Sequence, residues 1–299
     1  MSQSIDKSLG IQSRYMLASL EIKGWSGRAY DAKASAEVAV AHNAPVDSGR
    51  YNKMLVARDA MAERKRNSGK ARKFHYDSSL EWRKPWRLLP GKAFTDYSRT
   101  MREFMATDQR LVKQFLAVYP DLIEDAKRRL NGMFDPADYP APDSIGEFFS
   151  FENSIEAISD PGDFRVALQA DEVSTIKAEM TRSHRASIET AQKEIWGRVQ
   201  TVVRHMADKL KSYDVGADGK VESPFRDTLV SNISGLLDIL PGLNVKQDPN
   251  LTAIAEEIRR EVLGTTGDPQ ALRDSKLLRT QVAESAEAVL ERMAGFMDR

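Results

Sequence analysis

The spacing of apolar residues predicts a mainly helical chain with one unusually long helix. Over residues 171–213, apolar side chains recur every three or four positions, with a mean spacing of about 3.6 residues. That spacing is the period of a nearly straight α-helix. At about 1.5 Å per residue, such a helix of about 40 residues would extend roughly 64 Å, which is longer than a compact domain needs.

Several shorter helices are predicted before the long one. An alanine-rich helix covers residues 31–42, and a highly charged helix covers residues 52–74. An apolar stripe marks a third helix over residues 95–118. Pro120 suits the first turn of a separate short helix over residues 121–130, because the missing N–H of proline costs nothing there.

Three more helices are predicted after the long one. In each case a capping residue precedes a proline, which is typical of a helix start. These pairs are Ser223-Pro224, Asp248-Pro249 and Asp268-Pro269. The first of these helices should end near Pro241 and the second at Gly264, while the third should be irregular near Asp274-Ser275.

A small strand component is also expected. Alternation over residues 15–22 predicts a strand that runs into a turn at Gly24. Residues 134–170 are interrupted by prolines and contain two short apolar runs, at 148–151 and 164–168, which we interpret as strands of a connector that pairs with the first strand. The predicted fold class is therefore mainly α, with a minor α+β component.

The same patterns divide the chain into three segments. Residues 1–133 form a strand and a basic helical region, residues 134–170 form the acidic connector, and residues 171–299 form a helical bundle region that contains the long helix.

Composition excludes several classes of protein. The chain has no cysteine, so disulfide scaffolds, thiolate metal sites and thiol nucleophiles are ruled out. No run of about 18 apolar residues is present, and the first 20 residues lack a signal-peptide pattern. We therefore expect a soluble cytoplasmic protein that makes no membrane contact.

The charges are balanced in total but segregated along the chain. The 299 residues include 44 Lys and Arg against 44 Asp and Glu. The basic block, residues 50–102, has 15 basic and 5 acidic residues, whereas the acidic block, residues 131–172, has 10 acidic residues and one arginine. Such blocks on two copies of one chain can attract each other, which would give a homo-oligomer.

No catalytic motif is found. The chain lacks a phosphate-binding loop, a dinucleotide fingerprint, a zinc-binding helix motif and a nucleophile elbow, and its four histidines include no pair at helical spacing. We expect no enzyme, no cofactor and no metal.

A metal-dependent nuclease is the least favoured interpretation. It would use carboxylates such as Asp135, Asp138, Asp143 and Glu147. Residues 214–219 resemble a calcium loop only faintly, and a polar turn is favoured there.

The basic block holds the best candidate binding residues. Cations interleaved with rings between residues 64 and 87 are typical of single-stranded nucleic-acid binding, in which cations contact phosphates and rings stack on bases. The alternative is a solvated or protein-contacting basic helix face. The candidate residues are Arg64, Lys65, Arg66, Lys70, Arg72, Lys73, Tyr76, Trp82, Arg83, Lys84, Trp86 and Arg87.

Four segments of the chain resemble a family of uncharacterised proteins of bacteriophages, plasmids and integrative elements. They are the turn at residues 25–28, residues 115–123, residues 130–140 and residues 162–166. The resemblance implies an origin in a mobile element and a domain of unknown function. Some relatives are encoded near genes for a MoxR- or cobaltochelatase-like AAA+ ATPase, which implies an adaptor or substrate of such a machine. It assigns no functional residue.

Together these observations predict a non-enzymatic phage or mobile-element protein that acts through protein contacts, either by self-assembly or as a partner of a larger machine. The alternative function is a single-stranded nucleic-acid-binding protein of phage DNA metabolism. The expected location is the cytoplasm of the bacterial host cell, with the virion as the other possibility.

Overall fold

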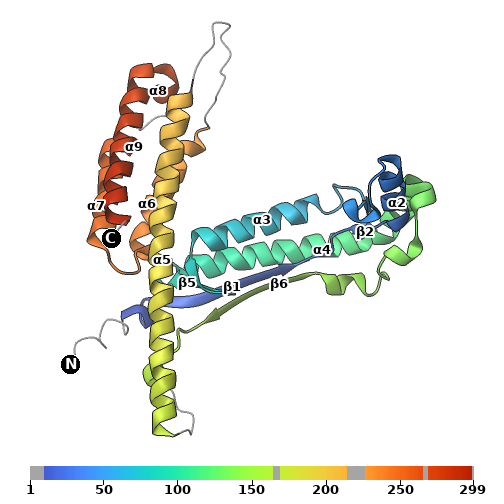
Figure 1. Cartoon of the computed structure of the whole chain (residues 1–299), viewed down its shortest axis with the longest axis horizontal. Helices are drawn as coiled ribbons and strands as arrows, with labels where there is room; N and C mark the ends of the chain where they lie inside the picture. The colour runs from blue at the N-terminus through green and yellow to red at the C-terminus, as the bar shows by residue number, and fades with distance from the viewer. Residues whose placement is uncertain (1–9, 164–168, 214–225, 265–268, 298–299) are drawn as a thin grey trace. The chain divides into compact units, whose positions relative to one another are not determined.

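The computed structural model describes residues 10–163, 169–213, 226–264 and 269–297 (Figure 1). The chain forms two compact units, each built from separate segments. The first unit contains Met1–Ala18, Ser78–Phe94 and Ile155–Arg299, and the second contains Ser19–Asp77 and Thr95–Ser154. Of the three segments drawn from the sequence, residues 1–133 and 134–170 each contribute to both units, whereas residues 171–299 lie in the first unit alone.

The predicted fold class and the predicted long helix are confirmed. Helix α5, Ala170–Ser212, has 43 residues. It begins with a capping box, in which the side chains of Gln169 and Glu172 each accept a hydrogen bond from the backbone N–H of the other residue. Buried residues such as Ile195, Val199 and Met206 follow the three- and four-residue spacing that the sequence shows. The long helix therefore arises from a continuous apolar stripe.

The core of the first unit lies between α5 and the helices that follow it. These are α6 (Thr228–Leu243), α7 (Pro249–Glu257), the π-helical turn η7 (Ile258–Leu263), α8 (Pro269–Asp274) and α9 (Lys276–Met297). Ala283 and Ala286 of α9 are buried in this core, and their small side chains let the two long helices approach closely.

The observed ends of these helices can be compared with the predicted boundaries. Asp248 caps α7 and accepts a hydrogen bond from the N–H of Asn250 at 2.9 Å, with Pro249 in the first turn, as predicted. The break between α8 and α9 at Ser275 is also confirmed. Helix α6 continues through Pro241 to Leu243, slightly beyond the expected end. The predicted start at Ser223-Pro224 lies outside the described residues.

An antiparallel hairpin and two longer strands form a four-stranded sheet in the order β4-β5-β1-β6. The strands are β1 (Tyr15–Lys23), β4 (Leu80–Arg83), β5 (Trp86–Pro90) and β6 (Ser150–Glu156). The predicted pairing of the connector with the first strand is confirmed by β1 and β6, although β6 begins two residues later than expected. The hairpin was not predicted. The second expected strand, residues 164–168, lies outside the described residues.

Two helices form the body of the second unit. They are α3 (Ala62–Asp77) and α4 (Phe94–Leu130), whose first residue belongs to the first unit. The prediction of separate helices at 95–118 and 121–130 was wrong, because α4 runs through Pro120 without a break. Pro120 is exposed, so its ring points away from the core, while Tyr119 beside it is completely buried. Burial of the core face keeps the helix continuous despite the missing N–H.

The predicted helix over residues 52–74 was also wrong in its first part. Residues Asn52–Met54 form strand β3, which pairs antiparallel with β2 (Arg28–Tyr30), and α3 begins only at Ala62. Leu55 and Val56, which follow β3, are buried in a core with Trp25 and Phe115. Helix α2 (Ala32–Ala41) is confirmed, with Asp31 as its N-cap. Short 3-10 turns complete the second unit, among them η1 (Val46–Ser48), η4 (Pro136–Asp138) and η5 (Ile145–Phe148).

None of the described helices is both long enough and apolar enough to cross a membrane.

We expect Trp82→Ala to destabilise the first unit by about 3–5 kcal/mol, because it removes a large ring from a packed core. Trp82 is only 4% exposed, and its ring packs against that of His184 with 5.4 Å between centroids. Trp82→Phe, which keeps an apolar ring, should cost less. Thermal unfolding followed by circular dichroism measures both. An unfolding midpoint for Trp82→Ala equal to that of the wild type would show that this burial is incorrect.

Candidate functional site

The candidate basic and aromatic residues do not share one element or one unit. Residues Arg64, Lys65, Arg66, Lys70, Arg72, Lys73 and Tyr76 lie on α3 in the second unit. Residues Trp82, Arg83, Lys84, Trp86 and Arg87 lie on the β4–β5 hairpin in the first unit.

The tryptophan side chains of the β4–β5 hairpin pack in the core of the first unit and are not fully exposed. Trp82 is buried, and Trp86 is half-buried and packs against the same core. Arg83 and Lys84 are exposed, and Arg83 donates a hydrogen bond to Ser183 Oγ at 3.1 Å. Because stacking on a base needs an accessible ring face, Trp82 cannot supply it in this conformation.

Arg87 is neutralised by a carboxylate of α5. Its Nη2 donates to Glu194 Oε1 at 2.8 Å, and Arg198 donates to the same oxygen at 2.6 Å. Burial alone would raise the pKa of Glu194, but hydrogen bonds from the Glu81 N–H and from both guanidinium groups outweigh it and hold that pKa below its usual value. Both arginines also donate to the Ser79 carbonyl, so the cluster ties the hairpin to α5.

Arg64 is likewise part of the internal structure, here of the second unit. Its Nη2 donates to Asp108 Oδ2 at 3.0 Å and to the Lys23 carbonyl at 2.7 Å, and its guanidinium lies 4.7 Å from the centre of the Phe149 ring. Burial raises the pKa of Asp108 despite the neighbouring positive charge of Arg64. Through these contacts, Arg64 links α3 to α4 and to the end of β1.

The remaining cations of α3 form an exposed basic face. Lys65, Arg72 and Tyr76 are spaced by seven and four residues and therefore lie on one side of the helix. Arg66 and Lys73 pair with acids of α3 itself, and Arg72 donates to the Ile22 carbonyl at 2.8 Å. The exposed residues of this face are Lys65, Arg66, Lys70, Arg72, Lys73 and Tyr76.

The two charged blocks are joined inside the chain at one buried lysine. Lys53 Nζ lies 2.7 Å from Asp138 Oδ2 and 3.5 Å from Asp31 Oδ2, and it donates to the Met133 carbonyl at 2.8 Å. Its side chain is only 7% exposed. The hydrogen bond to Asp138 raises the pKa of Lys53 although burial opposes it. This lysine fastens β3 to the start of α2 and to η4.

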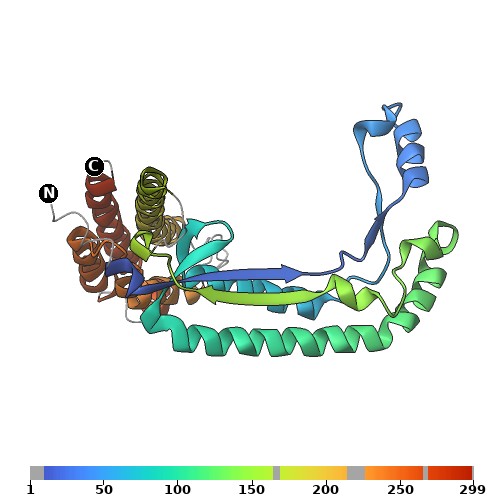
Figure 2. The ribbon, with the colours of Figure 1, turned by 90° about the horizontal axis from the view of Figure 1, so that it is seen from below.

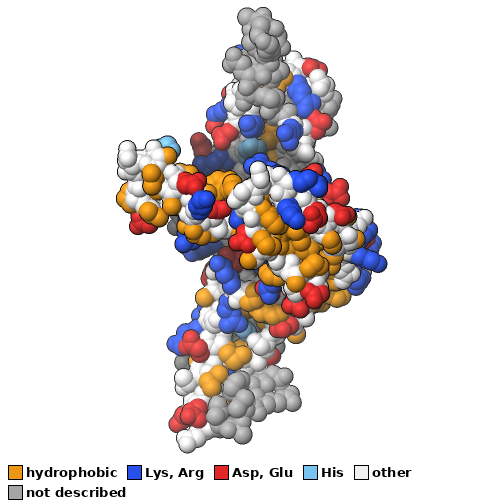
Figure 3. Space-filling model, turned by 90° about the vertical axis from the view of Figure 1, so that its right-hand side faces the viewer, with side chains coloured by type: hydrophobic (Ala, Val, Ile, Leu, Met, Phe, Trp, Pro, Cys, Tyr) orange, Lys and Arg blue, Asp and Glu red, His pale blue; other side chains and the backbone are white. Residues whose placement is uncertain are grey.

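Elsewhere the charges of both blocks are mixed with opposite charges. Arg64 and Arg87 pair with Asp108 and Glu194, which belong to neither block. On the face drawn in Figure 3, basic and acidic side chains lie interspersed over short distances. The segregation along the sequence is therefore partly cancelled within each unit.

Five large apolar side chains of the second unit are exposed within a short stretch of sequence. They belong to β2, α2, η1 and the residue before β3, and we call them the α2 surface: Tyr30, Val38, Val40, Val46 and Tyr51. Val40 is 74% exposed and Val46 is 62% exposed. Helix α2 packs mainly against η1, and within the second unit it stands beside the β2–β3 pair with no other helix over it (Figure 2).

Sequence reasoning did not single out this surface, although a signal was present. Residues 32–41 read Ala-Lys-Ala-Ser-Ala-Glu-Val-Ala-Val-Ala, so apolar residues surround the helix instead of forming one stripe. A helix that is apolar on all sides is normally covered by other elements. Within the described part of its unit, α2 buries only Ser35 and Ala39.

The described residues contain no group of three or more His, Asp or Glu side chains able to hold a metal ion. Of the carboxylates considered for a nuclease, Asp138 pairs with Lys53, and Asp135 caps η4 by accepting from the Ala137 N–H at 2.9 Å. Asp143 and Glu147 are exposed. The calcium-like loop, residues 214–219, lies outside the described residues.

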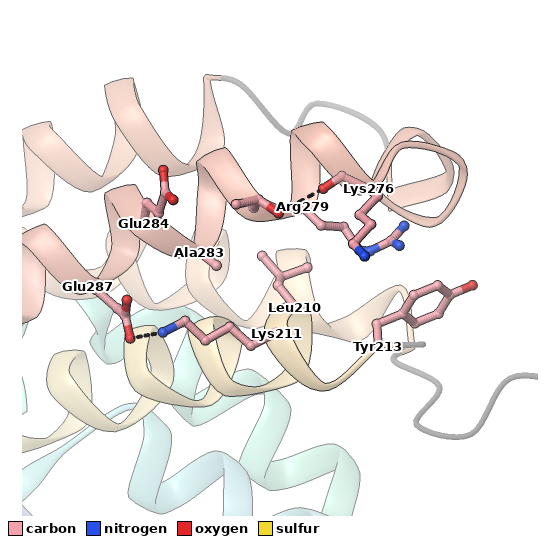
Figure 4. A pocket seen from close by; sticks show the side chains of 9 residues that line it. Leu210, Lys211, Tyr213, Lys276, Arg279, Ala283, Glu284 and Glu287 are labelled. Carbon is pink, nitrogen blue, oxygen red and sulfur yellow. Dashed lines mark hydrogen bonds and ion pairs between the residues drawn. The ribbon is translucent and has the colours of Figure 1, made fainter. Parts of the chain in front are cut away.

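The first unit has a small pocket between the end of α5 and the start of α9, with a volume of about 270 Å³ (Figure 4). Lys211 and Glu287 point toward each other across it and form an ion pair. Arg279 donates to the Leu272 and Arg273 carbonyls, both at 2.8 Å, and its guanidinium lies 4.6 Å from the centre of the Tyr213 ring. These contacts engage Lys211, Glu287 and Arg279, and the pocket is also lined by one further cation, Lys276, and one further carboxylate, Glu284.

Comparisons of the chain with protein-family models, with curated proteins and with solved structures give no match.

We expect Lys53→Met to destabilise the second unit by about 3–5 kcal/mol, because it leaves buried carboxylates without their cation. The raised pKa of Lys53 means that its contribution is fully present below the usual lysine pKa and is lost as the pH rises through the higher folded value. The difference between variant and wild type should therefore shrink in strong alkali. Urea unfolding at several pH values measures it.

The double variant Lys53→Met, Asp138→Leu should regain part of this loss, since it removes one of the uncompensated charges. If Lys53→Met unfolds at the same urea concentration as the wild type at neutral pH, the ion-pair cluster has no structural role.

Proposed function

We propose that this protein is non-enzymatic and acts by self-association through the α2 surface. The observation that carries the proposal is the exposure of large apolar side chains on a short helix that its own unit leaves uncovered. Val38, Val40 and Val46 are each more than half exposed. Val38 and Val40 are two positions apart and therefore lie on opposite sides of α2, so a partner that buries both must enclose the helix. Large exposed apolar side chains that gather on one part of a folded protein are typical of a contact surface.

The energetics favour burial of this surface in a contact. Full burial of an exposed valine side chain contributes about 1.5–3 kcal/mol. The five residues are between 44% and 74% exposed, so covering them would contribute roughly half of that value each and offset part of the free energy that association costs in lost freedom of motion. Because α2 is held at its start by Asp31, which also pairs with Lys53, the surface is already ordered before association. Such preorganisation lowers the cost of binding.

The proposed contact is apolar rather than ionic. Arg64, Arg87 and Lys53 of the basic block already have acidic partners within the chain, which weakens a contact in which the two charged blocks of different copies attract each other. Apolar association should persist at high salt, whereas association between charged blocks should not. The resemblance to the mobile-element family implies docking to a larger machine such as an AAA+ ATPase as a second role, and it assigns that role to no particular residue.

The molar mass of the protein tests the proposal. We expect it to rise with concentration between about 1 and 100 μM, at both 50 mM and 500 mM salt, in size-exclusion chromatography with light scattering. Val38→Ser, Val40→Ser should remain a monomer over this range. Val118→Ser is the matched control, because Val118 is an exposed valine of α4 outside the α2 surface, and it should behave like the wild type.

A monomeric mass for the wild type at every concentration and both salt levels would contradict the proposal. Association that disappears at 500 mM salt and is unchanged in Val38→Ser, Val40→Ser would instead support the contact between charged blocks.

Nucleic-acid binding is a second candidate function, and the exposed basic face of α3 favours it. Lys70, Arg72 and Lys73 are exposed along one helix, as contacts to a phosphate backbone require. Since Trp82 is buried and Trp86 half-buried, the proposed mode relies on phosphates more than on base stacking.

Fluorescence anisotropy with labelled single- and double-stranded DNA tests this candidate. We expect binding at 50 mM salt that falls steeply as salt increases, and that Lys70→Gln, Lys73→Gln weakens by roughly tenfold or more. Lys33→Gln, which removes an exposed lysine of α2, should have little effect. Absence of binding at 50 mM salt would exclude the candidate.

A further inference from the structure

A second pocket, in the second unit, has the character of an anion site. Its volume is about 340 Å³, and it is formed by the turn after β1, the β2–β3 pair, the segment after β3 and the start of α3. Three cations line it, namely Arg28, Arg58 and Lys65, and no carboxylate does. None of its residues belongs to the α2 surface, so the inference does not rest on the proposed self-association.

The three cations lack the compensation found elsewhere in the chain. No ion pair between them and any described carboxylate is present, whereas Arg64, Arg87 and Lys53 each have one. Like charges around one pocket repel each other, and an anion between them would relieve that repulsion. The pocket of the first unit differs, because Lys211 there is paired with Glu287.

The backbone around the pocket is fixed by a glycine and by strand pairing. Gly27 has a φ of +66°, and a Cβ at this position would lie 2.8 Å from the Met61 side chain. Its carbonyl accepts a hydrogen bond from the Leu55 N–H at 2.9 Å. Arg28 lies directly opposite Met54 in the β2–β3 pair, so both residues reach the pocket from adjacent strands.

The start of α3 adds to the positive potential. Met61 precedes the helix and Lys65 lies in its first turn, and both line the pocket. The N-terminus of a helix carries a partial positive charge, which adds to that of Lys65, although Glu63 in the same turn partly offsets it. Ser26 also lines the pocket, where its hydroxyl group is hydrogen-bonded to the backbone of Arg28.

We infer that this pocket binds a phosphate group. Two arginines can each offer a fork of N–H donors to phosphate oxygens, and a lysine adds a point charge, a set that suits a doubly charged tetrahedral anion better than a single carboxylate. Met54 and Met61 provide apolar contact for the group that carries the phosphate. The phosphate belongs either to a small phosphorylated molecule or to the backbone of a nucleic acid.

Isothermal titration of the full chain with inorganic phosphate and with ADP, together with DNA anisotropy, tests the inference. Arg28→Gln and Arg58→Gln should each weaken binding of the phosphate probe by roughly tenfold or more, because each removes a charge-assisted hydrogen-bonding group. Lys33→Gln is the matched control, an exposed lysine of α2 outside the pocket. Circular dichroism should show that all three variants fold, since the changed side chains are exposed.

The results separate the two sources of phosphate. Binding of ADP that is lost in Arg58→Gln and kept in Lys33→Gln supports a small phosphorylated ligand. Binding of DNA alone, weakened in Arg28→Gln and Arg58→Gln, supports a nucleic-acid backbone that passes through the pocket. The inference is overturned if no probe binds at 50 mM salt, or if the pocket variants bind every probe as tightly as Lys33→Gln.

Discussion

The buried ion pairs of Lys53 hold together the part of the protein on which both proposals depend. A lysine with 7% of its side chain exposed is costly to bury unless carboxylates and a carbonyl surround it, as Asp138, Asp31 and the Met133 carbonyl do. Asp31 is also the cap of α2, so one charge fixes the start of that helix. The same strand places Met54, the next residue, in the wall of the basic pocket.

This arrangement explains how a chain of zero net charge presents distinct surfaces. Where charges are buried they are paired, as in Arg64 with Asp108 and Arg87 with Glu194, and they join elements instead of binding ligands. What remains available in the second unit is an apolar surface on α2, an exposed basic face on α3 and a pocket with three uncompensated cations. The apolar surface is not covered by the rest of its unit, and the cations of the basic face and the pocket are exposed to solvent, so each of these surfaces is suited to a binding partner.

Much of the fold could be predicted because it depends on local patterns. The period of α5 and the caps at Asp31 and Asp248 are determined by neighbouring residues, and they appear where expected. The failures depend on contacts distant in sequence. Residues 52–54 are a strand because they pair with β2, and the burial of Lys53 beside Asp138, 85 positions away, holds them there. Helix α4 passes Pro120 because Tyr119 is buried beside it. A helical pattern contains no information about such partners.

The candidate site was predicted in part. The exposed cations of α3 lie on a solvated helix face, which the charge pattern does suggest, but the sequence cannot show that Trp82 enters a core with His184 or that Arg87 meets Glu194. Arg28 and Arg58 escaped notice because isolated cations carry no motif, and only folding brings them to Lys65.

Hydrogen–deuterium exchange of residues 32–41, compared at about 1 and 100 μM protein, tests the central claim that α2 is covered by a second copy. We expect the backbone amides of α2 to exchange markedly more slowly at the higher concentration, while those of α3 are unchanged, because association would bury the α2 surface and leave α3 exposed. Equal exchange of α2 at both concentrations would contradict the claim.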